Sequence, residues 1–340
     1  MAQFENVLAS VARASASGAL VRDFRDDAGR SRCMRALAGT MRLDDDLVRA
    51  LHPHEETHLG HLERVQSMVS GGGTPPLLLL IRDPRLDLWE SLRDCEAGEP
   101  VWDERRRDGE ERLFLCDGRE LLEEARSRLL NHGGMIADGH HRFQVLRHLR
   151  QHSGESPAMP VCLANLSDAP PVLLPGHLML SFRKAEQAAI ERAVESKLRL
   201  AYGPVPVRAP LSSPEAVADR LAELAPRRGI LLARSGDQEL RGFVPRDEQD
   251  ATAPLARIAT LLDLETAARR QNLSRTEDYS ASIVYGTERA LAGLTRTTTD
   301  LVLCLPSLPA IEIFEQALHG KLQPPKTTYF HPKPPGVDET

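Results

Sequence analysis

The sequence predicts an α/β protein with helices and strands mixed along the chain (α+β), and three observations carry this prediction. The stretch "PPLLLLI" at 75–81 is short, wholly apolar and bounded by prolines, which is typical of a strand covered on both faces. The stretch "MIAD" at 135–138 runs through Gly139 into a helical pattern over 141–151. In the second half of the chain, short apolar runs alternate with helical stretches that have one apolar face. We therefore expect helices packed on sheets in both halves.

The first half is predicted to open with a hairpin. Residues 18–43 form two strand-like runs that turn at 26–29, where "DDAG" supplies residues favoured in tight turns. A charged stretch at 82–119 interrupts the regular pattern. The other expected elements are a helix at 57–69, the strand at 75–81, a helix carrying Leu121 to Leu129, a strand at 135–138, a helix at 141–151 and a strand at 160–166.

The second half of the pattern starts after "DAPPVLLPGH" at 168–177. Its clearest local signal is Ser213 followed by Pro214, an N-cap residue and a first helical residue. The other expected elements are a helix at 184–199, strands at 229–234 and 300–306, and helices at 255–270 and 308–319. We therefore predict two domains, 1–175 with an insertion at 81–131, and 176–340 with a motif-bearing tail at 324–333.

Composition excludes several classes of protein. The net charge of −6 over 340 residues offers no basic field for nucleic acid. The first residues lack the features of a signal peptide, and no apolar run approaches the roughly 20 residues that span a bilayer. The five cysteines are scattered without a close pair, which predicts reduced thiols and no disulfide. We expect a cytoplasmic globular protein without nucleic-acid or membrane partners, and the sequence predicts no oligomeric state.

The turn at 138–142 concentrates polar side chains where a helix starts. Gly139 tolerates backbone conformations that strain other residues, and the start of a helix exposes free N–H groups and a positive dipole end. His140, His141 and Arg142 lie in the first turn, so their donors are placed to converge on a phosphate. Asp138 is placed to cap the helix or to hold a metal ion. The alternative is an Asp-capped helix with exposed polar residues, but cationic side chains at a helix N-terminus are unfavourable unless an anion joins them.

Four motifs occur in one order: "HEET" at 54–57, "IADGHHR" at 136–142, "LPGH" at 174–177 and "PPKTTYFHPK" at 324–333. In this they resemble the family called domain of unknown function 1015, within the ParB/sulfiredoxin superfamily. The resemblance covers about 18–337. It implies a ParB/sulfiredoxin-like nucleotide-binding module in residues 1–175 and an α/β half in residues 176–340.

The superfamily includes free-serine kinases, so the resemblance implies phosphoryl transfer from a nucleotide to the hydroxyl of a small metabolite, with serine or a serine-like amino acid first. It implies Glu55 as general base, with His54 and Asp138 as further catalytic residues and Asp138 close to Mg²⁺. The nucleotide is expected to be ATP or ADP, with CTP as a further candidate. Residues of three motifs are expected to bind it: Thr57, Gly139, His140, His141, Arg142, Lys326, Thr327 and Thr328. His177 and Tyr329 are expected to bind the substrate, and a simple docked tail remains the alternative for residues 326–328.

Two other functions stay open. "HEETH" at 54–58 fits the H-E-x-x-H motif of zinc metalloproteases, with His61 as a third ligand, although Pro53 places it at a helix start. A non-catalytic nucleotide-binding regulator is the other alternative. It is favoured by two departures from the family pattern, the lack of an N-terminal P-P-Y-D stretch and Leu178 in the usual place of an arginine.

Overall fold

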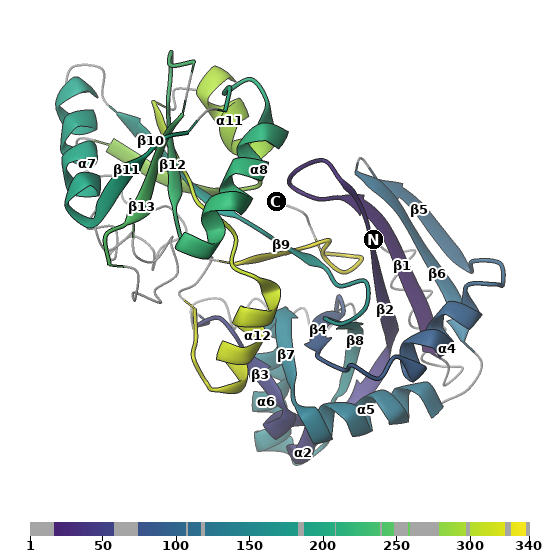
Figure 1. Ribbon diagram of the computed structural model, residues 1–340. Helices are drawn as coiled ribbons and strands as arrows, with labels where there is room; N and C mark the ends of the chain where they lie inside the picture. The colour runs from purple at the N-terminus through teal and green to yellow at the C-terminus, as the bar shows by residue number, and fades with distance from the viewer. Residues whose placement is uncertain are drawn as a thin grey trace.

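The structure of the chain is a computed structural model (Figure 1). It describes residues 17–57, 74–106, 108–116, 120–182, 187–207, 209–238, 240–247, 258, 279–296, 300–323 and 328–337. The helices predicted at 57–69 and 255–270 lie outside the described residues, apart from Thr57 and Ile258.

A mixed sheet of eight strands, with order β3-β7-β4-β8-β2-β1-β6-β5, organises the first half of the chain. β3 is parallel to β7 and β4 is parallel to β8, whereas the other neighbours are antiparallel. The strands β5 and β6, from the segment predicted as an insertion, extend this sheet from β1. The bounds are β1 Ser17–Arg25, β2 Ser31–Arg42, β3 Leu51–Pro53, β4 Leu77–Ile81, β5 Trp102–Arg106, β6 Gly109–Cys116, β7 Gly134–Asp138 and β8 Ala158–Asn165.

Helices cover both faces of this sheet. One apolar cluster packs Leu47, Trp89, Leu129 and Phe143 against the sheet. These residues come from helices α2 (Asp45–Ala50), α4 (Asp87–Cys95), α5 (Glu120–His132) and α6 (His140–Ser153). On the other face, helix α12 (Ala310–Leu318) buries Ile313 and Phe314. Every residue of β4 is buried, as its wholly apolar sequence predicts.

The second half forms an antiparallel sheet of six strands, with order β11-β13-β12-β15-β10-β14. Its described helices are α7 (Gln187–Ala201) on one face, and α8 (Pro214–Leu224) and α11 (Thr287–Arg296) on the other (Figure 1). Ser213 caps α8 by accepting the Ala216 N–H at 3.2 Å, which confirms the predicted helix start. The strands are β10 Gly176–Phe182, β11 Tyr202–Val205, β12 Ile230–Arg234, β13 Arg241–Pro245, β14 Tyr279–Tyr285 and β15 Leu301–Cys304.

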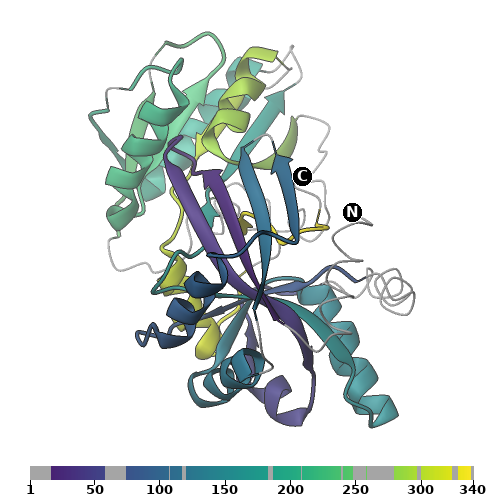
Figure 2. The same cartoon turned by 90° about the vertical axis from the view of Figure 1, so that its right-hand side faces the viewer.

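Contacts among the described residues join the halves at several places, of which two involve whole strands. The C-terminal strand β16 (Tyr329–His331) pairs with β9 (Val172–Leu174), which lies between the two sheets in sequence. The β1–β2 hairpin reaches across to α8 and α11 (Figures 1 and 2), where Arg30 forms an ion pair with Asp219 of α8. The predicted mixed α/β fold is confirmed, and no described helix is long and apolar enough to cross a membrane.

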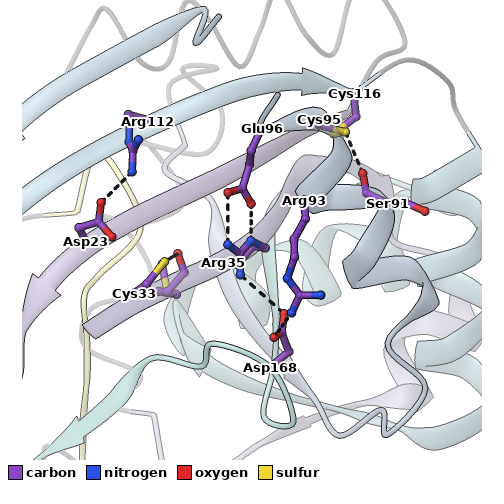
Figure 3. A network of polar contacts seen from close by, with 11 residues as sticks. Asp23, Cys33, Arg35, Ser91, Arg93, Cys95, Glu96, Arg112, Cys116 and Asp168 are labelled. Carbon is purple, nitrogen blue, oxygen red and sulfur yellow. Dashed lines mark hydrogen bonds and ion pairs between the residues drawn. A yellow bond between two sulfur atoms is a disulfide. The ribbon is translucent and has the colours of Figure 1, made fainter. Parts of the chain in front are cut away.

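The prediction of unpaired cysteines is wrong for one pair. α4 ends beside β6, and this brings Cys95 to Cys116 with a Cα–Cα distance of 5.3 Å in a disulfide (Figure 3). The two cysteines are 21 residues apart in the sequence, and their contact depends on how the helix packs against the strand. Their spacing alone therefore could not predict the disulfide. Around the disulfide, Arg35 is ion-paired with both Glu96 and Asp168.

Candidate functional site

The helix α6 starts at Gly139 without a capping side chain. This residue is the N-cap, and its φ of 94° lies in the left-handed region that glycine tolerates. A Cβ at this position would overlap the side chain of Leu77. No side chain caps the helix, so Asp138 does not act as its cap. The N–H groups of the first turn are thus held by no capping side chain, as an anion site at a helix N-terminus requires.

Asp138 is held between two cations. Its Oδ2 accepts Arg142 Nη2 at 2.5 Å, and its Oδ1 accepts Lys333 Nζ at 2.5 Å. Burial alone would raise the pKa of Asp138, but Lys333 and Arg142 hold it at about 2. The carboxylate is therefore ionised at neutral pH, and two cations against one anion leave this group with a positive balance.

Arg142 also fixes the segment before β4. Its Nη1 donates to the carbonyl oxygens of Pro75 and Pro76, at 2.6 and 2.9 Å. The side chain is 9% exposed, and this burial lowers its pKa. A phosphate would therefore compete for this guanidinium with the Asp138 carboxylate and the two proline carbonyls that it already contacts.

Glu55 lies two residues after the end of β3, at the start of a hydrogen-bonded chain of three polar side chains. Thr328 Oγ1 is 3.0 Å from Glu55 Oε2 and 2.7 Å from His54 Nε2. His54 Nδ1 donates to the Ile136 carbonyl at 2.6 Å. Burial lowers the pKa of His54 to about 4, so its ring is neutral at neutral pH.

His140 joins this chain to the start of α6. Its Nε2 lies 3.1 Å from His54 Nδ1, and the two rings meet edge to face at 4.6 Å. Burial, and then the neighbouring His54, lower the pKa of His140 well below its ordinary value. Two neutral histidines therefore connect the Glu55 side of the site to the Asp138 side.

The C-terminal segment completes the site. The Gln323 N–H donates to the His54 carbonyl at 2.7 Å, and its own carbonyl accepts the Glu56 N–H at 3.1 Å. From β16, the Tyr329 ring packs on Tyr285 at 4.7 Å and lies under the Lys333 ammonium, 4.4 Å from the ring centre. Residues from the first half of the chain and from its C-terminal segment thus form one cluster.

The structure gathers most, but not all, of the predicted site residues. His54, Glu55, Asp138, His140, Thr328 and Tyr329 belong to the cluster through the contacts above, with Gly139, His141 and Arg142 at the start of α6. Thr57 is half-buried two residues after Glu55. Lys326 and Thr327 lie outside the described residues. Lys333 had no predicted role, although it ends the C-terminal motif.

His177 makes its hydrogen bonds elsewhere. It is fully buried on β10, where Nε2 lies 3.2 Å from Thr287 Oγ1 and Nδ1 accepts the Leu305 N–H at 3.1 Å. Thr287 in turn bonds to Asp27 in the β1–β2 turn. Burial lowers the pKa of His177 to about 3. Its contacts join the hairpin to the second sheet, and its predicted role in substrate binding stays a prediction.

The donor set does not favour a resident metal ion. Both oxygens of Asp138 are held by cations, and the described residues contain no group of three or more His, Cys, Asp or Glu placed around a metal. The zinc-hydrolase alternative needs His54 on a helix, but residues 54–57 are not helical, and His58 and His61 lie outside the described residues. Magnesium stays a prediction.

Comparison with known proteins identifies the family of this chain and finds solved structures that resemble it only weakly. No curated protein matches the chain. A structure of "free serine kinase in complex with AMP" shares 14% identity over 86% of each chain, with a TM-score of 0.43. SbnI with a C-terminal truncation from Staphylococcus aureus shares 12% identity over 88% of this chain and 84% of its own, with a TM-score of 0.44. A conserved hypothetical protein from Pyrococcus furiosus shares 16% identity over 86% and 89%, with a TM-score of 0.40. Values this low assign no activity to this chain.

The model of the family described as "protein of unknown function (DUF1015)" matches residues 12–261, and the chain belongs to that family.

Proposed function

We propose that this protein transfers a phosphoryl group from a nucleotide to the hydroxyl of a small metabolite. One observation carries the proposal: a half-buried carboxylate, Glu55, belongs to the same cluster as an uncapped helix N-terminus with a surplus of positive charge. A helix N-terminus and cations suit phosphate, and a carboxylate is suited to accept the proton of an attacking hydroxyl. Phosphoryl transfer needs positioning and charge neutralisation more than a covalent nucleophile.

In this proposal each side of the cluster has one task. The N–H groups that open α6, with His140, His141 and Lys333, bind the phosphates of the nucleotide, and Glu55 takes the proton of the acceptor. Serine or a serine-like amino acid is the first acceptor to test, because the four sequence motifs resemble those of proteins related to free-serine kinases. ATP, ADP and CTP are the nucleotides to compare, and no step is assigned to magnesium.

The proposal is tested by product formation. Wild-type protein is incubated with serine, threonine or homoserine and each nucleotide, with and without magnesium, and the products are followed by phosphorus NMR. We expect one phosphorylated amino acid and an equal amount of the nucleotide shortened by one phosphate. Consumption of the nucleotide without a phosphorylated acceptor would contradict transfer to a metabolite, and no reaction with any pair would contradict the proposal.

A non-catalytic nucleotide-binding regulator is the second candidate, and the contacts of Arg142 favour it. A phosphate that attracted this guanidinium would draw it from the Pro75 and Pro76 carbonyls and release the segment before β4. Ligand-driven release of a segment is one way in which proteins switch. Calorimetry together with the product assay distinguishes the candidates. A regulator is expected to bind a nucleotide tightly in calorimetry and to form no phosphorylated product.

A further inference from the structure

The chain Glu55–Thr328–His54 is one proton short of a complete set of hydrogen bonds. Its two contacts, of 3.0 and 2.7 Å, require one proton each. An ionised carboxylate only accepts, and a threonine hydroxyl has one proton to donate. The missing proton would have to come from the histidine or from the carboxyl group.

The histidine does not supply it. A backbone carbonyl only accepts, so the 2.6 Å contact with the Ile136 oxygen places the ring proton of His54 on Nδ1. Burial keeps this ring neutral, so Nε2 carries no proton. The single hydroxyl proton of Thr328 therefore has two acceptors, Glu55 Oε2 and His54 Nε2, and it satisfies only one of them at a time.

In the part of the protein that the structure describes, charged and titratable groups from β7, α6, β14 and the C-terminal segment lie around these three side chains. Asp138 of β7 is ionised and bound to Lys333 of the C-terminal segment, and His140 of α6 is neutral. Tyr285 of β14 lies against Tyr329 of β16, and burial, with the charge of Glu55, raises the pKa of Tyr285. The tyrosine thus keeps its proton at neutral pH.

We infer that His54 strengthens Glu55 as a base by competing, through Thr328, for the one hydroxyl proton. When Glu55 is ionised and holds the hydroxyl, the buried Nε2 of His54 lacks the donor beside it, which is unfavourable. When Glu55 gains a proton, it donates to Thr328 Oγ1, and Thr328 turns its proton to His54. Protonation therefore completes the chain, and Thr328 and His54 are positioning residues for Glu55.

This inference rests on the proposed phosphoryl transfer, where it defines the fate of the proton. The acceptor oxygen forms a bond to the terminal phosphorus as its proton moves to Glu55. The bond from that phosphorus to the bridging oxygen breaks, and its electron pair leaves with the shortened nucleotide. The Thr328 proton then turns from Glu55 to His54, so the chain holds the transferred proton until it is released to solvent.

The test is the titration of Glu55 without nucleotide or acceptor. The carboxyl carbon of Glu55 is followed by NMR in protein labelled with carbon-13 at the glutamate carboxyl, and its signal is assigned by its loss in Glu55→Gln. His54→Asn keeps an amide donor near the position of Nδ1 but has no atom at Nε2, so it should lower the titration midpoint of Glu55 by about one pH unit. His54→Gln, whose amide reaches the Nε2 position, should lower it less.

A second substitution shows whether the effect passes through Thr328. In a Thr328→Val background, His54→Asn should no longer move the midpoint, whereas in a Thr328→Ser background it should act as in the wild type. An unchanged midpoint in His54→Asn, or an equal shift with valine at 328, would overturn the inference.

A third readout needs no change at His54. The nitrogen-15 signal of His54 Nε2 in the wild type should move with the midpoint of Glu55 and lose this coupling in Thr328→Val. A signal that stays fixed through the titration would also overturn the inference. None of these readouts depends on activity, so a coupled titration in an inactive protein would contradict the proposed function alone.

Discussion

In the part of the protein that the structure describes, two hydrogen-bonded chains link a carboxylate, a threonine and a histidine, and a different backbone group faces the Nδ1 atom of the histidine in each. In one, Asp27, Thr287 and His177 join the β1–β2 hairpin to the second sheet. In the other, Glu55, Thr328 and His54 lie beside the N-terminus of α6. In both, the Nε2 atom of the histidine faces the threonine hydroxyl.

The difference lies at Nδ1. His177 Nδ1 accepts the N–H of Leu305 at 3.1 Å, so the proton of this neutral ring is on Nε2 and is donated to Thr287. Thr287 then donates to Asp27, and every contact has its proton. His54 Nδ1 instead donates to the Ile136 carbonyl, which leaves its Nε2 without one. A single backbone group thus makes one chain a closed structural link and the other a chain that can take up a proton.

The largest difference between the chains is expected in catalysis. Glu55→Gln should lower the rate of phosphoryl transfer by about 10²–10⁴-fold, because a positioned base contributes that much, while nucleotide affinity stays within a few-fold. Product formation by mass spectrometry and affinity by calorimetry measure the two effects. The control is Glu56→Gln, an exposed neighbour that should leave the rate nearly unchanged. Equal losses in both variants would remove Glu55 from the role of base.

The ionised carboxylate of Asp138, in the same cluster as Glu55, Thr328 and His54, is expected to stabilise the fold. The pKa of Asp138 is lowered to about 2, so its stabilisation is present above its unfolded value near 4 and is lost as the pH falls towards 2. A pKa lowered by roughly two corresponds to about 2–3 kcal/mol. Asp138→Asn should lose about this much free energy of unfolding in urea at pH 7, and the difference from the wild type should shrink below pH 4. A difference that is constant with pH would show that the charge of Asp138 is not what stabilises the fold.

The free energy of unfolding is expected to depend on the number of protons in the chain Asp27–Thr287–His177. Asp27→Asn replaces an acceptor with an amide that can donate, so the chain through Thr287 and His177 would hold one proton too many. The free energy of unfolding should therefore fall by about 1–3 kcal/mol. The same variant should keep the specific activity of its folded fraction, measured as product formed per folded molecule. Full stability with lost activity would place Asp27 in the site and not in the link between the sheets.

The smallest effect is expected from a matched pair of threonine substitutions. Thr287→Val leaves the buried Nε2–H of His177 and the Asp27 carboxylate without their common partner, and should cost about 1–3 kcal/mol. Thr328→Val removes a hydroxyl that satisfies only one of its two acceptors, and should cost about 1 kcal/mol or less. Thermal or urea unfolding compares them, with the serine variants as controls. A larger loss at 328 than at 287 would contradict the difference in proton count.

Much of the fold follows from the sequence because its signals are local. The buried β4 needs only its apolar run, α8 needs only Ser213 and Pro214, and the hairpin needs its turn at 26–29. The disulfide between Cys95 and Cys116 could not be predicted in this way, because it depends on how α4 packs on β6. The return of α12 and β16 to the first sheet is also a long-range contact without a local signal.

The sequence predicted only those residues of the candidate site that belong to the motifs with an expected role. The motif resemblance named Glu55, Asp138 and Thr328, and the structure connects all three to one cluster. It assigned no role to Lys333, whose proximity to Asp138 depends on the course of the tail. The tautomers of His54 and His177 depend on whether a backbone N–H or C=O faces the ring, and no residue type encodes that choice.

The most direct test of the difference between the two chains is one two-bond proton–nitrogen-15 spectrum of the wild-type histidines at neutral pH. The geometry predicts that His177 carries its ring proton on Nε2 and that His54 carries it on Nδ1, both as neutral rings. Variants of each histidine assign the signals. The same tautomer in both rings, or a doubly protonated His54, would contradict the account, because the Glu55 chain would then already hold the proton that it is expected to lack.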